Sequence, residues 1–270
     1  MSGAPQRVPP VPAVLRLVQL AVLGKWRATG DDLYREVARL TEAAAGREII
    51  VSGCGDGSTT EWLAKRTGAA VTGVDSSAEA IEAAERRARA TGATYKLHYQ
   101  HAELEDLPHE TAVFDVAIGE PALAAADHPA RAVEELVRVT RPMGTVLLLQ
   151  PTWSSEISAG TKEMLVERYM LRPHLLVEWK QMMRDAGVVE LEVQDWTSGG
   201  PGTRTSEHAA IASELSWKDK ARIVSRAWRR GWRAARGALE EEANLLRELS
   251  RERAIGFQLI KGIKWRPSRT

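Results

Sequence analysis

The 270-residue sequence contains a single cysteine, Cys54. An intrachain disulfide is therefore excluded, and the chain suits a reducing compartment. A dominant charge is also missing, because 37 Lys and Arg residues nearly balance 36 Asp and Glu residues, for a formal net charge of +1. A near-neutral chain argues against broad electrostatic capture of nucleic acid.

Long apolar runs are absent too. The apolar stretch at residues 11–23 is interrupted by Pro12, Arg16 and Gln19. It falls short of the roughly 20 apolar residues that a membrane-spanning helix needs. Arg16 also lies where a signal peptide would have its apolar core, and no small-x-small cleavage site follows. We therefore expect a cytoplasmic protein.

Three glycines at alternate positions, Gly53, Gly55 and Gly57, follow an apolar run at residues 48–52. A helix-like segment comes next, and a second apolar run ends at Asp75. Strand, glycine turn, helix, strand and terminal acid is the order of a nucleoside-binding βαβ unit. The glycines let a ligand lie against bare main chain, and the acid can accept hydrogen bonds from ribose hydroxyls.

The spacing of this turn discriminates among nucleotides. It reads Gly-x-Gly-x-Gly, whereas dinucleotide-binding proteins carry Gly-x-Gly-x-x-Gly. No Lys followed by Ser or Thr comes after the glycines, which excludes a triphosphate-binding P-loop. The turn also contains no basic residue to meet a phosphate. A ligand with a ribose but no phosphate fits better, and S-adenosylmethionine is the common one.

Three further segments follow the turn in a recognisable order. They are residues 103–108 (Glu-Leu-Glu-Asp-Leu-Pro), 114–118 (Phe-Asp-Val-Ala-Ile) and 138–147 (Arg-Val-Thr-Arg-Pro-Met-Gly-Thr-Val-Leu). Together with the Gly-Cys-Gly-Asp-Gly turn they resemble the class I S-adenosylmethionine-dependent methyltransferases, in particular the menaquinone and ubiquinone type that methylates small molecules. The conjunction of four segments is specific, whereas each one alone is not.

Two positions depart from that family. Val51 stands where an acid is usual, and Met143 stands where a glycine is usual. The usual acid assists the amino group of the methionine moiety, and Asp56 or main-chain carbonyls are the candidates to take over that role. Cys54 is interpreted as a small residue that fits a tight bend, because no histidine is near it in sequence to activate a nucleophile.

The resemblance implies an α/β fold: a Rossmann-like, mostly parallel seven-stranded sheet with helices on both faces, an antiparallel last strand and a helical insert before it. Strand patterns that alternate with helical segments favour the same architecture. The expected organisation is a pair of N-terminal helices over the substrate side (1–45), a cofactor-binding core (46–200), the helical insert (201–254), and the last strand with a tail (255–270).

The resemblance also implies which residues bind the cofactor. They belong to the glycine turn and to the segments after the second, third and fourth strands: Gly53, Cys54, Gly55, Gly57, Asp75, Ser76, Glu103, Leu104 and Gly119. Asp75 would accept the ribose hydroxyls, or it could cap the next helix, a role that Ser77 could also fill. Glu103 would accept from the adenine amino group, with the Leu104 N–H at the ring; the alternative for Glu103 is a solvated loop acid.

Glu120 and His128 are the candidates for a general base near the methyl acceptor. A base is needed when the acceptor is a hydroxyl or phenol that must lose its proton. Otherwise alignment of the nucleophile with the methyl group removes much of the barrier. His101, His174 and Tyr34 are further candidates that the sequence does not rank. No cluster of residues has the spacing of a metal site.

A second distinctive segment is the basic stretch at residues 217–236, with eight Lys and Arg residues and one acid, Asp219. Trp228 and Trp232 lie on its opposite helical face. The simplest interpretation is an amphipathic helix whose tryptophans pack on the domain. Alternatives are peripheral contact with an anionic membrane surface, contact with RNA, or a roof over the substrate pocket.

We therefore expect methyl transfer from S-adenosylmethionine to a small acceptor that is apolar or aromatic. Methylation of RNA or protein is the second hypothesis, and a non-catalytic protein that binds S-adenosylmethionine is the third. Whether the chain forms a homo-oligomer stays open at this point.

Overall fold

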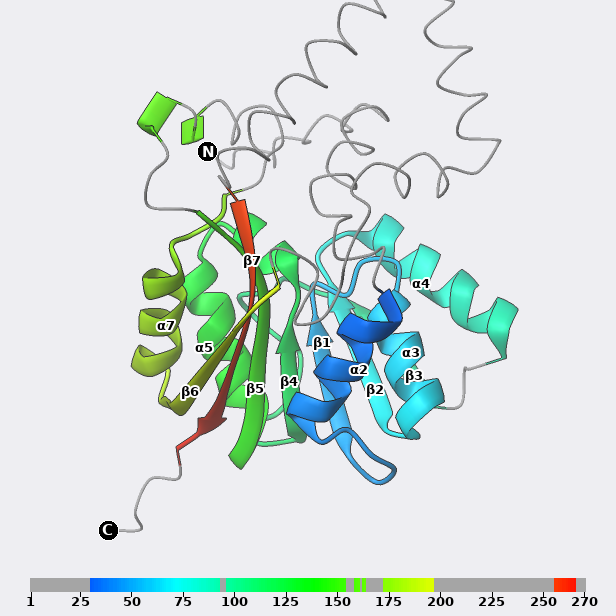
Figure 1. Cartoon of the computed structure of the whole chain (residues 1–270). Helices are drawn as coiled ribbons and strands as arrows, with labels where there is room; N and C mark the ends of the chain where they lie inside the picture. Colours follow the sequence, from blue (N-terminus) through cyan, green and yellow to red (C-terminus); the bar gives the residue numbers. More distant parts are fainter. Residues whose placement is uncertain are drawn as a thin grey trace, which may run out of the picture.

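The computed structural model describes residues 30–92, 96–153, 158–160, 162–163, 172–196 and 255–265. The apolar stretch at 11–23, the basic stretch at 217–236 and the whole of the expected insert at 201–254 lie outside these residues. Seven strands form one sheet in the order β3-β2-β1-β4-β5-β7-β6 (Figure 1). Strands β1 to β5 pair in parallel, whereas β7 is antiparallel to both β5 and β6. The expected mostly parallel sheet with an antiparallel last strand is confirmed.

Helices separate consecutive strands along the chain as far as β6, except that β4 follows β3 with no helix between them. The strands are β1 Glu48–Ser52, β2 Ala70–Asp75, β3 Leu97–His101, β4 Phe114–Gly119, β5 Thr140–Trp153, β6 Val188–Asp195 and β7 Ile255–Lys264. The helices are α2 Gly30–Thr41, α3 Ser58–Thr67, α4 Ala78–Thr91, the short 3-10 helix η2 Pro121–Ala125, α5 Pro129–Val139 and α7 Leu176–Asp185. No helix among the described residues has the length and apolarity that crossing a membrane requires.

Apolar side chains cover both faces of the sheet. On β1, Ile49 and Val51 belong to a core shared with α2, α3 and α4, whereas Ile50 belongs to a second core shared with η2, α5 and α7. Successive side chains of a strand point to opposite faces, so a strand with helices on both sides is apolar throughout. The helices on both faces, seen on either side of the sheet in Figure 1, are therefore confirmed.

Helix boundaries near the site follow from their capping residues. Helix α3 begins after Gly57 and ends before Gly68, both in the left-handed conformation with φ of 76° and 75°. Helix α4 begins after Ser77, whose side-chain oxygen accepts the N–H of Ala80 at 3.2 Å, and ends before Gly92. Serine at the start and glycine at the end are typical of helix caps.

Strand β5 begins at Thr140, before the apolar run that follows Gly144, and continues to Trp153. Its pairing with β4 shifts register between Phe114 and Val116, which are opposite Thr140 and Thr145. The extra residues of β5 include Met143, whose φ of 65° lies in the left-handed region. This conformation explains why glycine is usual at that position, since a side chain there is strained.

Candidate functional site

The glycine turn lies at the carboxyl end of β1, and β1 lies between β2 and β4 in the sheet. The main-chain N–H groups of Gly53 and Cys54 both donate to the carbonyl of Val74, at 2.7 and 3.0 Å. The N–H of Gly57 donates to the carbonyl of Cys54 at 3.0 Å. The turn is thereby tied to the end of β2, where ligands of open α/β sheets bind.

Close neighbours explain two of the three glycines. Gly53 and Gly57 each have φ of 76°, and a Cβ atom on Gly53 would lie 2.6 Å from the Cβ of Ala122. A Cβ atom on Gly57 would lie 2.6 Å from the hydroxyl oxygen of Tyr99. Gly55 differs, because a Cβ atom there would meet no atom within 4 Å. The main chain at Gly55 therefore borders open space that a ligand can enter.

Asp75, the last residue of β2, is 7% exposed and binds the turn directly. Its Oδ2 accepts the N–H of Gly55 and its Oδ1 accepts the N–H of Ser77, each at 2.9 Å. A carboxylate oxygen can accept a second hydrogen bond, so both oxygens keep capacity for ribose hydroxyls. Ser77 caps α4, which leaves Asp75 without that role. The neighbouring Ser76 is exposed, and its carbonyl lies 3.0 Å from His101 Nε2.

Cys54 is buried inside the turn. Its desolvation, together with the negative charges of Asp75 and then Glu120, raises the pKa of the Cys54 thiol. The thiol therefore stays protonated at neutral pH and is a poor nucleophile. A Cβ atom on Gly73 would lie 2.9 Å from its Sγ, so the thiol fills space beside β2. This agrees with the interpretation of Cys54 as a packing residue.

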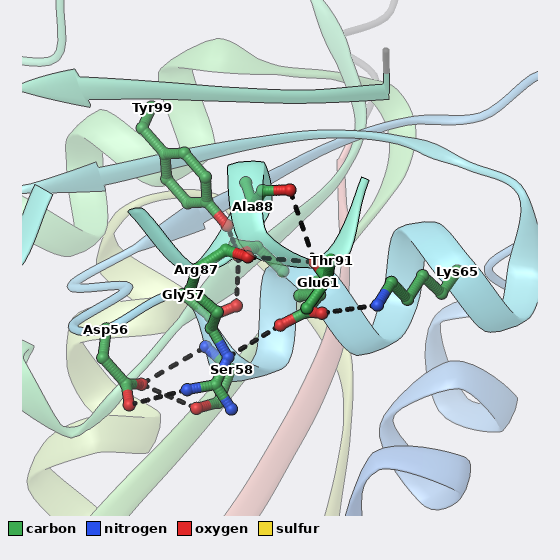
Figure 2. A network of polar contacts seen from close by, with 10 residues as sticks. Asp56, Gly57, Ser58, Glu61, Lys65, Arg87, Ala88, Thr91 and Tyr99 are labelled. Carbon is green, nitrogen blue, oxygen red and sulfur yellow. Dashed lines mark hydrogen bonds and ion pairs between the residues drawn. The ribbon is translucent and has the colours of Figure 1, made fainter. Parts of the chain in front are cut away.

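A network of hydrogen bonds and ion pairs links the glycine turn and α3 to α4 (Figure 2). Arg87 of α4 donates to Glu61 at 2.7 Å and lies 3.3 Å from Asp56 Oδ2, while Lys65 donates to Glu61 at 2.6 Å. Asp56 Oδ1 accepts the side-chain hydroxyl of Ser58 at 2.6 Å and its N–H at 3.3 Å. The carboxylate of Asp56 thus accepts hydrogen bonds from Ser58 at the start of α3 and from Arg87 of α4.

Val51, at the position of the missing acid, has no exposed surface and lies in the core that contains α2 and α3. Its neighbours across the sheet are Gly73 of β2 and Ile118 of β4. A carboxylate here would lose its hydration among apolar side chains, at a large cost in free energy. The valine is therefore suited to its surroundings, and any carboxylate for the ligand must come from another position.

Of the two residues expected to bind the adenine, both in the segment after β3, one lies at the surface and one in the core. Glu103 is exposed and Leu104 is buried in the core that contains α5 and α7. The Glu103 carbonyl accepts the N–H of Asp106 at 3.3 Å, which closes a turn. Such a turn offers a free carboxylate and a fixed main chain on neighbouring residues, the combination expected for an adenine edge.

Two residues of α5 fix this segment, and the sequence reasoning missed their role. Glu135 Oε2 accepts the N–H of Leu107 at 2.9 Å, and Arg138 donates to the carbonyls of Leu107 and His109 at 2.9 and 2.8 Å. Arg138 also donates to Glu135 at 2.8 Å, and this contact holds the pKa of Glu135 below its ordinary value. The sequence pattern that could have indicated this role is an acid and an arginine three residues apart on a helix, because such side chains lie next to each other.

At the end of β4 the main chain is held from both neighbouring strands. The N–H of Glu120 donates to the carbonyl of Ser52 at 2.9 Å. From β5, the buried side chain of Gln150 donates to the carbonyls of Gly119 and Glu120, at 3.0 and 2.8 Å. Glu120 is 8% exposed. The role of Gln150 was also not predicted, because a single glutamine within an apolar strand belongs to no recognisable sequence motif.

The other candidate bases are not gathered at the turn. His128 is exposed and precedes α5, with its N–H donating to Glu105 at 3.2 Å. His174 lies 3.5 Å from Glu178 and stacks edge-on against Trp179. Tyr34 of α2 packs against Trp62 of α3, with ring centroids 5.7 Å apart. His101 ends β3 beside Asp75.

The candidate residues follow the order of the strands. Glu103 and Leu104 come after β3, Asp75 ends β2, the glycine turn comes after β1, and Glu120 comes after β4. Because β3, β2, β1 and β4 are consecutive neighbours with parallel directions, these residues form a row along one edge of the sheet. An extended ligand with a base, a sugar and a third group can contact them in that sequence.

Comparison with known proteins agrees with this geometry. Residues 50–148 match the family described as "Methyltransferase domain". The chain is 29% identical over 168 residues to the O-methyltransferase cnsE of Penicillium expansum, covering 62% of this chain and 60% of that protein. It is 24% identical over 205 residues to the chloroplastic tocopherol O-methyltransferase of Arabidopsis thaliana, covering 72% of this chain and 56% of that protein. The chain thus spans less than two thirds of the length of these relatives.

Solved structures share the fold. The cyclase SpnF superposes with a TM-score of 0.66 at 22% identity, covering 87% of this chain and 80% of that one. Phosphoethanolamine N-methyltransferase 2 of Haemonchus contortus, solved with S-adenosyl-L-methionine, superposes with a TM-score of 0.64 at 16% identity, covering 85% and 51%. The strand order, the glycine turn with its acid at the end of β2, and the methyltransferase-domain match over residues 50–148 make this part of the chain similar to the class I S-adenosylmethionine-dependent methyltransferases.

Proposed function

We propose that this protein binds S-adenosylmethionine across the glycine turn and transfers its methyl group to a small acceptor. The observation that carries the proposal is the hydrogen bond between Asp75 and Gly55, at 2.9 Å. It joins a buried carboxylate with spare acceptor capacity to a stretch of main chain that borders open space. A ribose needs the first of these features, and a ligand lying across the turn needs the second.

The row of residues along the sheet edge suits each part of this ligand. Glu103 and the N–H of Leu104 would meet the adenine, and Asp75 would accept the ribose hydroxyls. The bare main chain of the turn would lie beneath the ligand, and the end of β4 would meet the methionine moiety. Ser76, Gly119 and the buried Cys54 would contribute shape and main-chain contacts.

The chemistry requires little from the protein beyond alignment. When bound, S-adenosylmethionine supplies a methyl group made electrophilic by its sulfonium. A lone pair of the acceptor forms the bond to the methyl carbon while the electrons of the carbon–sulfur bond return to sulfur. Fixing the nucleoside through Asp75 and the turn holds the methyl group in line, which removes much of the entropic barrier. An acceptor hydroxyl would lose its proton to Glu120, to His128 or to water.

A small acceptor of apolar or aromatic character fits the sequence best. Residues 11–23 are rich in apolar side chains, and nine tryptophans are present in the chain. The Arabidopsis thaliana relative is named for tocopherol, an apolar phenol. A net charge of +1 argues against RNA, which favours a basic surface. Retention on RNA that weakens with added salt would revive the second hypothesis.

A protein that binds the cofactor without transferring its methyl group is the rival proposal. A structure named as a cyclase has the same fold, so the fold does not by itself fix the reaction. The valine at position 51 is a further reason to test binding and turnover separately.

Calorimetry with purified protein tests binding first. We expect saturable binding of S-adenosylmethionine and S-adenosylhomocysteine, and no comparable binding of NADH or ATP. Mass spectrometry of the native protein would identify a co-purified adenosyl compound. Transfer of a labelled methyl group to a panel of phenols, catechols and quinols then tests catalysis. Binding without turnover across the panel would favour the rival, and failure to bind either adenosyl compound would refute the proposal.

A further inference from the structure

We propose that Arg87 of α4 is a positioning residue for the cofactor site, because it holds the glycine turn in the shape that receives the nucleoside. This inference rests on the proposed function, since it takes S-adenosylmethionine as the ligand of the turn. Arg87 is assigned no contact with the ligand. Its guanidinium acts through Asp56, which lies between the second and third glycines of the turn.

The guanidinium of Arg87 binds two acids that lie on either side of Gly57 in the sequence (Figure 2). Its Nε donates to Glu61 Oε2 at 2.7 Å, and its Nη1 donates to Asp56 Oδ2 at 3.3 Å. Asp56 belongs to the glycine turn, whereas Glu61 lies in the first turn of α3. A single side chain of α4 therefore holds the glycine turn and the start of α3 together.

Close packing makes the turn sensitive to the position of α4. A Cβ atom on Gly57 would lie 2.9 Å from the Cβ of Ala84, which is buried and precedes Arg87 by three residues. Residues three apart are neighbours on a helix surface, so Arg87 extends from α4 beside this contact. The start of α4 is tied to the site as well, because the N–H of its capping residue Ser77 donates to Asp75 Oδ1 at 2.9 Å. Helix α4 is thus attached to the site at its N-cap and again at Arg87.

The ion pair with Glu61 fixes the guanidinium. The side chain of Glu61 is 11% exposed, so its attraction to Arg87 is screened less than that of a fully exposed pair. Lys65 donates to the same carboxylate at 2.6 Å. Burial raises the pKa of Glu61, but hydrogen bonds from Lys65, Thr91 and Arg87 outweigh burial and hold that pKa below its ordinary value. Glu61 therefore stays ionised at neutral pH and keeps Arg87 within reach of Asp56.

The turn has to be held because glycine is the most flexible residue. Gly53, Gly55 and Gly57 all have positive φ, and glycine loses more conformational freedom on ordering than any other residue. A turn that is ordered before the ligand arrives loses less entropy on binding. Gly55, whose main chain borders open space, directly precedes Asp56. Releasing Asp56 from Arg87 should therefore loosen the main chain on which the nucleoside would lie.

The other two arginines of α4 offer a matched comparison. Arg86 and Arg89 pair with Glu82 and Glu85, one turn away on α4 itself. These side chains are largely exposed, and such pairs contribute little. Arg87 instead crosses from α4 to the turn and to α3. Removing the charge of Arg86 should therefore leave the cofactor site as it is.

Calorimetry with three ligands separates a change in the shape of the turn from a direct effect of charge. S-adenosylmethionine is a cation at neutral pH, whereas S-adenosylhomocysteine and 5′-methylthioadenosine carry no net charge. Arg87→Gln should weaken all three by a similar factor of about 3 to 10, because they share the nucleoside. Removal of a positive charge that acted directly on the ligand would instead favour S-adenosylmethionine over the other two, and that outcome would overturn the inference.

A double-mutant cycle tests whether Arg87 acts through Asp56. Asp56→Asn keeps a side-chain oxygen for Ser58 but removes the charge that faces Arg87. It should weaken 5′-methylthioadenosine, which lacks the methionine moiety, and Arg87→Gln in that background should weaken it little further. An equal factor in both backgrounds would overturn the inference, because Arg87 would then act by another route. General destabilisation would lower the urea midpoint but leave the affinity of the folded protein unchanged.

Control variants complete the test. Arg86→Gln should leave all three affinities unchanged, and weakening equal to that of Arg87→Gln would count against the inference, as would wild-type affinities of Arg87→Gln. If Arg87→Gln does not fold, Arg87→Lys keeps the charge but not the planar fork, and it should still weaken all three ligands. Wild-type affinities of Arg87→Lys would then overturn the inference. Failure of the wild-type protein to bind any of the three would refute the proposed function itself, which is a distinguishable result.

Discussion

The carboxylate of Asp75 accepts the main-chain N–H of Gly55 at 2.9 Å, across 20 residues of sequence. The acid at the end of β2 and the turn after β1 are therefore one structural unit. A substitution at Asp75 acts on the ribose site and on the shape of the turn together, so affinity and stability must be measured side by side.

Replacing Asp75 by asparagine should weaken S-adenosylmethionine by about 10- to 100-fold, as expected for losing a hydrogen bond to a charged group. The asparagine has one acceptor oxygen, whereas the aspartate serves both Gly55 and Ser77. In the asparagine variant, the N–H of Gly55 or of Ser77 would then face the side-chain NH2 group, which cannot accept its hydrogen bond. Calorimetry gives the affinity, and urea unfolding gives the accompanying loss of stability.

The matched control is Asp185→Asn, at an exposed position at the end of α7. It removes the same charge away from the turn and should bind as the wild type does. Wild-type affinity of Asp75→Asn would refute the ribose assignment.

Replacing Gly57 by alanine should destabilise the fold by about 3 kcal/mol, the combined effect of left-handed strain and overpacking. The new Cβ atom would lie 2.6 Å from the Tyr99 hydroxyl and 2.9 Å from the Cβ of Ala84. Gly92→Ala is the control, because Gly92 has φ of 68° but no atom within 4 Å of such a Cβ. Urea unfolding of both variants separates the contact from the strain, and equal losses would contradict the crowding at Gly57.

The Glu135–Arg138 pair should make stability depend on pH in the acid range. The hydrogen bond from Arg138, opposed by burial and helped by the Leu107 N–H, holds the pKa of Glu135 below its ordinary value. A depressed pKa in the folded state contributes stability above the unfolded value of about 4.3, and this contribution is lost as pH falls through the folded pKa. The free energy of unfolding of Glu135→Gln should therefore vary less than that of wild type between about pH 5 and pH 3.

At neutral pH Glu135→Gln should be less stable by about 3 kcal/mol, since it leaves Arg138 without its buried carboxylate. The neighbouring Glu134, which pairs with Arg131 at the surface, is the control. Glu134→Gln should change stability by less than about 0.5 kcal/mol, as is usual for exposed ion pairs. Parallel pH profiles of wild type and Glu135→Gln would contradict the role of this carboxylate.

Met143→Gly should stabilise the protein by about 1 kcal/mol, because a left-handed residue with a side chain is strained and glycine is not. Met143 has φ of 65° and its surface is 60% exposed, so little packing is lost with the side chain. Met143→Ala removes the same side chain but keeps the Cβ atom, and it should show no such gain. Urea unfolding distinguishes the two variants, and a destabilised glycine variant would contradict the strain.

The sheet and the turn could be predicted from the sequence because their signals are local. Apolar runs at Ile49–Val51 and before Asp75, with glycines between them, specify a strand, a turn and a strand within one short segment. The residues that hold the site together escaped prediction because their contacts are distant in sequence. Gln150 and Arg138 reach carbonyls about 30 residues away, and no pattern within β5 or α5 indicates those partners.

The register shift between β4 and β5 was not predicted, for a related reason. Pairing with β4 and with β7 extends β5 beyond its apolar run, and neither partner is visible from the residues of β5 alone. Asp56 was a reasonable candidate for the missing acid because it lies within the turn. Its engagement with Arg87 depends on the docking of α4, a tertiary contact that the sequence does not specify.

The position of β7 has a consequence for synthesis on the ribosome. Strand β7 hydrogen-bonds to β5 on one side and to β6 on the other, although it follows all the other described strands in the sequence. A nascent chain that has emerged only through residue 196 leaves one edge of β5 open and β6 without a described strand to pair with. Completion of the sheet therefore waits for residues 255–264. Until then, the exposed edge of β5 is a surface that chaperones, or other nascent copies, can bind.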